Sequence, residues 1–316
     1  MQTITIAGGR LRARLIPFGA TLVDLYLEGW QHSLVLGFER LEDYARTNHY
    51  AGAVIGRHAN RIFRGEVVLD GKAVQLPANG DGNHLHGGET GLARQTWTIL
   101  GQTERALRLE CISPDGHEDY PGTCRFVATY EIVDDATLRL TLEAVTDRTT
   151  LVNLCQHPYF NFSGRTDIFD HVLEVDAERY LPSDADLIPT GEQKSVTGTP
   201  FDFSAPRSIG ANRPSPGYNN NFCLADRTRT EPQFAARLTA PGGPMMELWT
   251  TQTGLHVYDG YKLADGQLGS EGRVFGPNAG ICLEAQNWPD SPRNSNFPSA
   301  VLSPDQTYYQ VTEYRF

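Results

Sequence analysis

Hydrophobic and polar residues alternate with a period of two in several short runs along the chain. The run 137–143 reads TLRLTLE, and the runs 107–110 and 172–176 repeat the pattern. Because successive side chains of a strand point to opposite faces, these runs predict strands with one buried and one exposed face. Asp-Gly, Asp-Asp and Pro-Asp pairs, which favour turns, occur between such runs at 70–71, 134–135, 259–260 and 304–305.

Helical periodicity is scarce in this sequence. The best candidate is a short helix around Leu41 to Arg46, and no stretch shows a sustained period of 3.6 or a regular alternation of strands and helices. Glycine and proline number 31 and 19, above average usage for this length, which favours many turns over long helices. The pattern predicts an all-β fold, a large antiparallel β-sandwich with few short helices.

The chain is expected to form a single domain, residues 1–316. Its loosest stretch, Ala205 to Asn221, reads APRSIGANRPSPGYNNN and is a candidate boundary between domains. Strand-like alternation resumes after it, so we interpret it as a long functional loop. A chain of 316 residues with 40% hydrophobic content is long enough to bury a large core.

Net charge indicates which binding partners to expect, and the cysteine pattern indicates the cellular compartment. The formal net charge is −11, which repels nucleic-acid phosphates and anionic membranes, so we expect neither as a partner and favour a neutral substrate. The five cysteines are scattered and form no CxxC pair, which predicts reduced, buried thiols in a cytoplasmic protein. No apolar run has the length of a signal peptide core or a membrane span.

Polar side chains and turn residues come together in four stretches that are candidates for chemistry. They are GRHANRI at 56–62, NHLHGG at 83–88, LCQHPYFNFSG at 154–164 and ICLEAQNWPD at 281–290.

Glu284 and His157 are the strongest candidates for catalytic residues in these stretches. Glu284 follows an Ile-Cys-Leu run typical of a buried strand, and His157 lies among apolar and aromatic residues. A buried carboxylate costs free energy unless it is paired or hydrogen-bonded. Two plainer interpretations remain: Glu284 is the outward residue of an alternating strand, and His157 is a core histidine. A His and a Glu in one cleft form an acid–base pair near neutral pH.

His84 and His86 have a spacing found in metal sites, because on a strand both rings would face one side, and Glu89 follows closely. A later histidine that would complete a cupin-like ligand set is missing, so we expect no metal. The alternative is that one ring lies in a site and the other packs behind it.

Planar polar groups and aromatic rings suggest a sugar ligand. Asn60 and the neighbouring Arg57 and Arg61 suit hydrogen bonding to vicinal hydroxyls. Trp288 and the aromatic residues around His157 offer flat apolar faces to a sugar ring. A solvated strand edge and core packing are the alternatives.

Together the four stretches resemble the aldose 1-epimerase (galactose mutarotase) family. They are similar to its segments GR-x-x-NRI, N-x-LHGG, H-x-YFN-L-x-G and LE-x-Q-x-x-PD…FPS, which occur here in the same order as GRHANRI, NHLHGG, HPYFNFSG and LEAQNWPDSPRNSNFPS. The early IPFGATLVDLYL and the closing YYQVTEYRF are also similar to the ends of that family. The resemblance therefore covers nearly the whole chain.

This resemblance implies a galactose mutarotase-like supersandwich that interconverts the α and β anomers of a free aldohexose or aldopentose. It implies no cofactor and no metal. By the same resemblance, His157 is the general acid and Glu284 the general base. The oligomeric state, monomer or homodimer, stays open. The sugar-binding positions of the family fall on Asn60, Arg61, His86 and Tyr159.

Two further positions depart from the family pattern and leave the preferred sugar open. Asn219 lies in GYNNNF, where the family usually has Asp in GYD-x-x-F, and His256 lies in TGLHVY, where it often has Gln in PG-x-Q-x-Y. Both are expected to contact sugar hydroxyls. Asn can donate a hydrogen bond where Asp only accepts, and it removes a charge.

Other functions remain as alternatives. A phosphorylated-hexose 1-epimerase would need a cationic clamp, for which Arg57, Arg61, Arg94 and Arg293 are available, although the chain is acidic. A sugar-binding protein could share the fold without the reaction. A glycosidase is less favoured, because it normally needs two opposed carboxylates and only Glu284 stands out.

Overall fold

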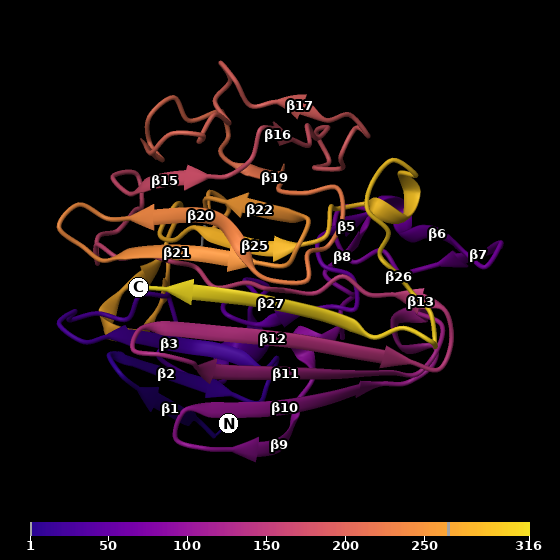
Figure 1. The fold of residues 1–316 in the computed structure, drawn as a ribbon, viewed down its shortest axis with the longest axis horizontal. Coiled ribbons are helices and arrows are strands. Elements are labelled where there is room, and N and C mark those ends of the chain that lie inside the picture. Colours follow the sequence, from indigo (N-terminus) through magenta and orange to yellow (C-terminus); the bar gives the residue numbers. More distant parts are fainter. Residues whose placement is uncertain (1, 264–265) are drawn as a thin grey trace.

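The computed structural model describes residues 2–263 and 266–316 and is built mainly from antiparallel strands (Figure 1). Its one α-helix within these residues, α1 (Asp43–Arg46), is shorter than the 41–46 predicted from the sequence. The remaining helical elements are short 3-10 turns. None of the described helices is long and apolar enough to cross a membrane. The predicted all-β class with few short helices is confirmed.

The largest sheet has nine strands and extends from the lower edge of the molecule into its upper half as drawn in Figure 1. The predicted strands at 107–110, 137–143 and 172–176 all lie in it. Along its strand Thr137–Thr146, Leu138, Leu140 and Leu142 are buried, while the residues between them are partly exposed. In spatial order the sheet comprises β18 (Arg207–Ser208), β15 (Val172–Val175), β20 (Gln233–Thr239), β21 (Met245–Thr250), β27 (Tyr308–Arg315), β12 (Thr137–Thr146), β11 (Cys124–Ile132), β10 (Ala106–Ser113) and β9 (Thr98–Gln102).

A second sheet of five strands carries the polar residues of the later motifs. One of its faces is apolar: Leu255, Val257 and Leu283 belong to the same buried cluster as Leu140 of the nine-stranded sheet. The two sheets therefore share a core, as in a sandwich. In spatial order the strands are β17 (Lys194–Ser195), β16 (Arg179–Tyr180), β19 (Asn219–Cys223), β22 (Gly254–Tyr258) and β25 (Cys282–Gln286).

Smaller sheets complete the molecule. An N-terminal sheet of β1 (Ile4–Gly8), β2 (Leu11–Ile16) and β3 (Thr21–Leu27) contacts β11 and contributes to the shared core. The two-stranded pairs are β4 (Val54–Ile55) with β14 (Cys155–Gln156), β5 (Arg61–Ile62) with β8 (His84–Leu85), β6 (Glu66–Leu69) with β7 (Lys72–Gln75), β13 (Thr150–Leu151) with β26 (Val301–Leu302), and β23 (Gln267–Leu268) with β24 (Val274–Phe275).

The predicted turns fall at strand ends. Asp70 and Gly71 join β6 to β7, and both have positive φ angles, 49° and 74°, as a two-residue type I′ hairpin requires. The stretch 205–221 is less of a loop than predicted, because β18 joins the nine-stranded sheet and β19 joins the five-stranded one. That residues 1–316 form one domain stays a prediction.

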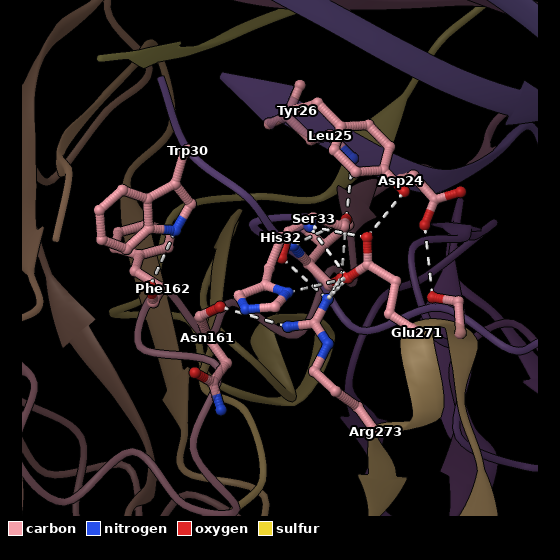
Figure 2. A network of polar contacts seen from close by, with 12 residues as sticks. Asp24, Leu25, Tyr26, Trp30, His32, Ser33, Asn161, Phe162, Glu271 and Arg273 are labelled. Carbon is pink, nitrogen blue, oxygen red and sulfur yellow. Dashed lines mark hydrogen bonds and ion pairs between the residues drawn. The ribbon is translucent and has the colours of Figure 1, made fainter. Parts of the chain in front are cut away.

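A polar network fastens the β23–β24 hairpin to the N-terminal sheet (Figure 2). Glu271 accepts hydrogen bonds from the Tyr26 hydroxyl at 3.0 Å and from the Ser33 backbone N–H at 3.1 Å. Arg273 Nη2 donates to the Ser33 carbonyl at 2.8 Å. The network therefore ties Glu271 and Arg273 of this hairpin to the N-terminal part of the chain.

Candidate active site

The register of three neighbouring strands sets the floor of the site. Glu284 of β25 lies directly opposite His256 of β22, and Asn219 of β19 lies opposite Tyr258. Residues two apart on a strand share a face, so Asn219, His256 and Glu284 all project from the side opposite the shared core. The five-stranded sheet therefore has one apolar face toward the shared core and one polar face on the opposite side.

A cavity of about 310 Å³ lies over this polar face, a volume that suits a small ligand. It is lined by the eight residues that the motifs of the family resemblance predicted to act in catalysis or sugar binding, but not by Arg57 or Trp288. The eight residues are Asn60, Arg61, His86, His157, Tyr159, Asn219, His256 and Glu284.

His157 and Glu284 are adjacent and buried within this cavity. Imidazole Nε2 lies 3.6 Å from carboxylate Oε1, and the two side chains are only 6% and 2% exposed. Burial raises the pKa of Glu284 from 4.5 to about 8 and lowers the pKa of His157 from 6.5 to about 4, because each loses the hydration that stabilises its charged form. The plainer interpretation of Glu284 as the outward residue of an alternating strand fails in one respect: the side chain faces away from the shared core but is buried and not solvated.

The two groups titrate together because they are so close. Between about pH 4 and about pH 8 the pair carries one titrating proton. That proton lies either on the carboxylate, with both groups neutral, or on the imidazole, which makes an ion pair. The positive charge of Arg61 lowers the pKa of Glu284 and so favours the ion pair. The arrangement can therefore accept and donate a proton within one small volume.

Two thiols lie against this pair. Cys155 Sγ is 3.6 Å from Glu284 Oε2, and Cys282 Sγ is 3.4 Å from His157 Nδ1. Burial raises the pKa of both thiols well above the ordinary value. All five cysteines are free and buried, as the sequence predicted.

Asn60 and His86 are held by the β5–β8 pair in left-handed backbone conformations, with φ angles of 62° and 55°. The Asn60 N–H donates to His86 Nδ1 at 3.2 Å, and the His86 N–H donates to the Asn60 carbonyl at 3.0 Å. Burial lowers the pKa of His86 well below its ordinary value. With Nδ1 accepting, the neutral ring carries its proton on Nε2 and is a hydrogen-bond donor.

The metal interpretation of His84 with His86 is wrong because their rings are used separately. His84 Nδ1–H donates to the Pro77 carbonyl at 2.8 Å, and Nε2 accepts from the Tyr120 hydroxyl at 2.7 Å. Both nitrogens of His84 are thus engaged away from the cavity, whereas His86 lines it. The alternative, one ring in the site and one behind it, is confirmed.

Asn219 and His256 are joined to each other at the cavity wall. His256 Nε2–H donates to Asn219 Oδ1 at 2.7 Å, and burial lowers the pKa of His256 to about 3, so the ring is neutral. Its Nδ1 has no hydrogen-bond partner among the described residues. The pair is therefore uncharged, and the ring nitrogen that lacks a partner is itself buried.

Sequence reasoning missed several residues of the cavity wall, among them Tyr50, Tyr258 and Lys262. The Tyr50 ring lies 4.9 Å from the His86 ring between centroids, and Tyr50 has a φ angle of 55°. The segment 48–50 has no periodicity and belongs to none of the recognised motifs. Its left-handed tyrosine is visible only in the fold.

The four arginines considered for a phosphate clamp lie in different environments. Arg57 is buried and donates to Ser113 and to backbone carbonyls of Pro114 and Pro121. Arg94 holds the segment before Tyr50 through three of its carbonyls. Arg293 pairs with Asp290. Of these four arginines, Arg61 alone lines the cavity within the part of the chain that the structure describes.

Trp288 is a core residue and offers no face to a ligand. Its side chain is fully buried, packs edge-on against Phe297 with centroids 5.0 Å apart, and donates through Nε1–H to the Thr253 carbonyl. Tyr159, by contrast, lines the cavity, and its hydroxyl donates to the His49 carbonyl at 3.1 Å.

Comparison with known proteins gives a consistent result along the whole chain. The sequence profile described as Aldose 1-epimerase matches residues 2–315. Galactose mutarotase from Mus musculus is 38% identical over 326 residues, which cover 100% of this chain and 94% of that protein. Aldose 1-epimerase from Escherichia coli (strain K12) is 32% identical over 318 residues, or 96% of this chain and 91% of that protein.

Solved structures agree with the sequence comparison. The GalM/aldose epimerase homologue from C. elegans superposes with a TM-score of 0.93 at 27% identity, covering 99% of this chain and 98% of that one. Galactose 1-epimerase from Lactobacillus acidophilus superposes with a TM-score of 0.86 at 28% identity, covering 99% and 93%. The chain belongs to the aldose 1-epimerase family, as its motifs predicted.

Proposed function

We propose that the protein interconverts the α and β anomers of a free aldose in this cavity, with Glu284 as general base and His157 as general acid. The observation that carries the proposal is the buried pair itself, 3.6 Å apart and exposed only to the cavity. Family membership supports the class of carbohydrate epimerase. The names of the relatives, galactose mutarotase and aldose 1-epimerase, support a free sugar as substrate.

The reaction requires two proton movements and no net change in protonation. Glu284 takes the proton of the anomeric O1 hydroxyl while the C1–O5 bond breaks, so that C1–O1 becomes a carbonyl. The ring oxygen O5 takes its proton from His157. After rotation about C1–C2, the roles reverse: O5 attacks the other face of C1, returns its proton to His157, and O1 regains a proton from Glu284. Each positioned transfer contributes roughly 10²–10⁴-fold to the rate.

The electrostatics of the cavity support this assignment of roles. The reactive form needs an ionised Glu284 and a protonated His157. Burial disfavours each charge alone, but opposite charges 3.6 Å apart stabilise one another. Arg61 lowers the pKa of Glu284 and assists the same form. His86 and Asn60 supply the neutral donors and acceptors that a sugar hydroxyl can use.

Polarimetry on freshly dissolved α-anomers tests the proposal. We expect the wild type to speed the approach to equilibrium rotation, and Glu284→Gln to lose roughly 10²–10⁴-fold of that acceleration. Glu104→Gln, on an exposed residue, is the matched control and should keep the wild-type rate. Near-normal activity of a folded Glu284→Gln protein would refute the assignment of the base.

A hexose phosphate belongs in the same panel because the cavity wall holds a second cation. Lys262 lines the cavity together with Arg61, and both Arg and Lys side chains are common phosphate ligands. We expect free sugars to be preferred, since Lys262 is largely exposed. Faster turnover of the phosphorylated sugar would assign the protein to the phosphorylated-hexose alternative instead.

A further inference from the structure

His157 and Glu284 also belong to a group of three side chains whose nitrogen, sulfur and oxygen atoms could bind a metal ion. Cys282 Sγ lies 3.4 Å from His157 Nδ1, and His157 Nε2 lies 3.6 Å from Glu284. One donor atom from each of His157, Cys282 and Glu284 lies within 4.8 Å of the other two, and all three residues are buried. A nitrogen, a sulfur and an oxygen at this spacing match the ligands that Zn²⁺ binds in proteins.

We propose that His157, Cys282 and Glu284 form an inhibitory binding site for a soft divalent cation, Zn²⁺ or Cd²⁺. Three protein ligands leave the fourth position of a tetrahedral ion open. His157 and Glu284 both line the cavity, so the ion reaches the site by the route that a sugar takes. Its open position faces the cavity and takes a water molecule or a sugar hydroxyl.

The charge balance of the bound state fits a buried location. The thiol of Cys282 loses its proton on binding, because the thiolate is the metal ligand. The titrating proton of the His157–Glu284 pair leaves as well, so that a neutral imidazole and a carboxylate face the ion. One thiolate and one carboxylate then neutralise the dication, and no net charge is buried.

Inhibition follows from which groups the ion occupies. The carboxylate that would accept the O1 proton and the imidazole that would donate to O5 are both ligands of the ion. Proton transfer therefore stops while the ion is bound. This inhibitory effect rests on the proposed function, whereas binding of the ion does not.

Cys155 provides an internal control for the role of Cys282. Its Sγ lies 3.6 Å from the other oxygen of Glu284, and it is as buried as Cys282, yet it is outside the group of three. A reaction of any buried thiol would affect both cysteines. A site built on His157 and Glu284 selects Cys282.

The test is a titration of the wild-type protein with Cd²⁺, followed by its ultraviolet thiolate-to-cadmium absorption and by polarimetry on the same samples. We expect the absorption to saturate at about one ion per chain, as expected for one closed ligand set. The rate should fall on the same curve and return after EDTA. Cys155→Ala should keep both signals. Cys282→Ala should lose the absorption band and weaken inhibition at least about tenfold, in the range seen when support of a metal site is removed.

Each variant is compared with its own metal-free rate, and Cys282→Ser replaces Cys282→Ala if the latter does not fold. Equal inhibition of Cys282→Ala and wild type overturns the proposal, as does loss of the band in Cys155→Ala alone. A protein that binds Cd²⁺ but never speeds mutarotation contradicts only the proposed function. A protein that speeds mutarotation but shows no band contradicts only the metal site.

Discussion

The pH dependence of mutarotation tests how His157 and Glu284 share their proton. Burial places the two titrations of the pair at about 4 and about 8. Below about pH 4 a second proton neutralises Glu284, so the base is lost. Above about pH 8 the pair loses its last proton, so the acid is lost. Between these values the reactive arrangement is a constant fraction of the protein, and the rate should be flat.

The size of the fall in rate at alkaline pH distinguishes this pair from a histidine with an ordinary pKa. With a titration at about 8, the rate at pH 8 is about half of the plateau, and at pH 9 about a tenth. A histidine with its ordinary pKa of about 6.5 would leave only about 3% of the plateau at pH 8. The two expectations differ by more than about tenfold at a pH where other buried histidines stay neutral.

The assay is polarimetry of one α-anomer between about pH 5 and about pH 10, with the buffer-catalysed rate subtracted at each pH. Circular dichroism at each pH shows whether the protein stays folded. His157→Gln is the control, and its small residual rate should lack the alkaline fall that the acid produces. A wild-type rate that falls with a midpoint near 6.5, or that rises through pH 8, would refute the reasoning.

Three further predictions concern specificity and stability. Asn219→Asp adds a charge that only accepts hydrogen bonds, and we expect it to change the ratio of kcat/KM between galactose and glucose about tenfold; a panel of sugars with unchanged ratios contradicts this. Arg57→Met removes a buried guanidinium that makes five hydrogen bonds and leaves its uncharged acceptors unpaired, so urea unfolding should show a loss of about 1–3 kcal/mol in the free energy of unfolding, against almost none for the exposed Arg46→Met. Burial lowers the pKa of His58 from 6.5 to about 3, so the folded state binds this proton more weakly than the unfolded chain does; its contribution is complete above about pH 6.5 and falls by about 3 kcal/mol by about pH 4. His58→Gln should flatten that part of the urea midpoint against pH, and the exposed His32→Gln should not.

Much of the fold class was present in the sequence as local patterns. The alternation at 137–143 lies in strand β12 of the nine-stranded sheet, and Asp70-Gly71 forms a hairpin turn with two positive φ angles. These signals are readable because alternation and turn chemistry depend on neighbouring residues only. Short strands such as β18 escaped prediction, since two residues carry no period.

Local patterns did not predict which polar side chains would be buried and which would line the cavity. Arg57 and Arg61 share one motif, yet Arg57 is buried against Ser113 while Arg61 lines the cavity. His84 and His86 are two residues apart, yet His84 contacts the Tyr120 hydroxyl while His86 lines the cavity. In each case the backbone turns between the two residues, and segments distant in the chain decide which side chain they cover.

By itself, the sequence determined an antiparallel β-fold, membership of a family, and eight of the residues that meet in one cavity. Only the tertiary structure decided the protonation of those residues, the pairing of Asn219 with His256, and the thiols that lie against His157 and Glu284. The reason is physical. Alternation and motifs are properties of neighbouring residues, whereas the pKa of a side chain depends on the water and charges removed or added by every strand packed around it.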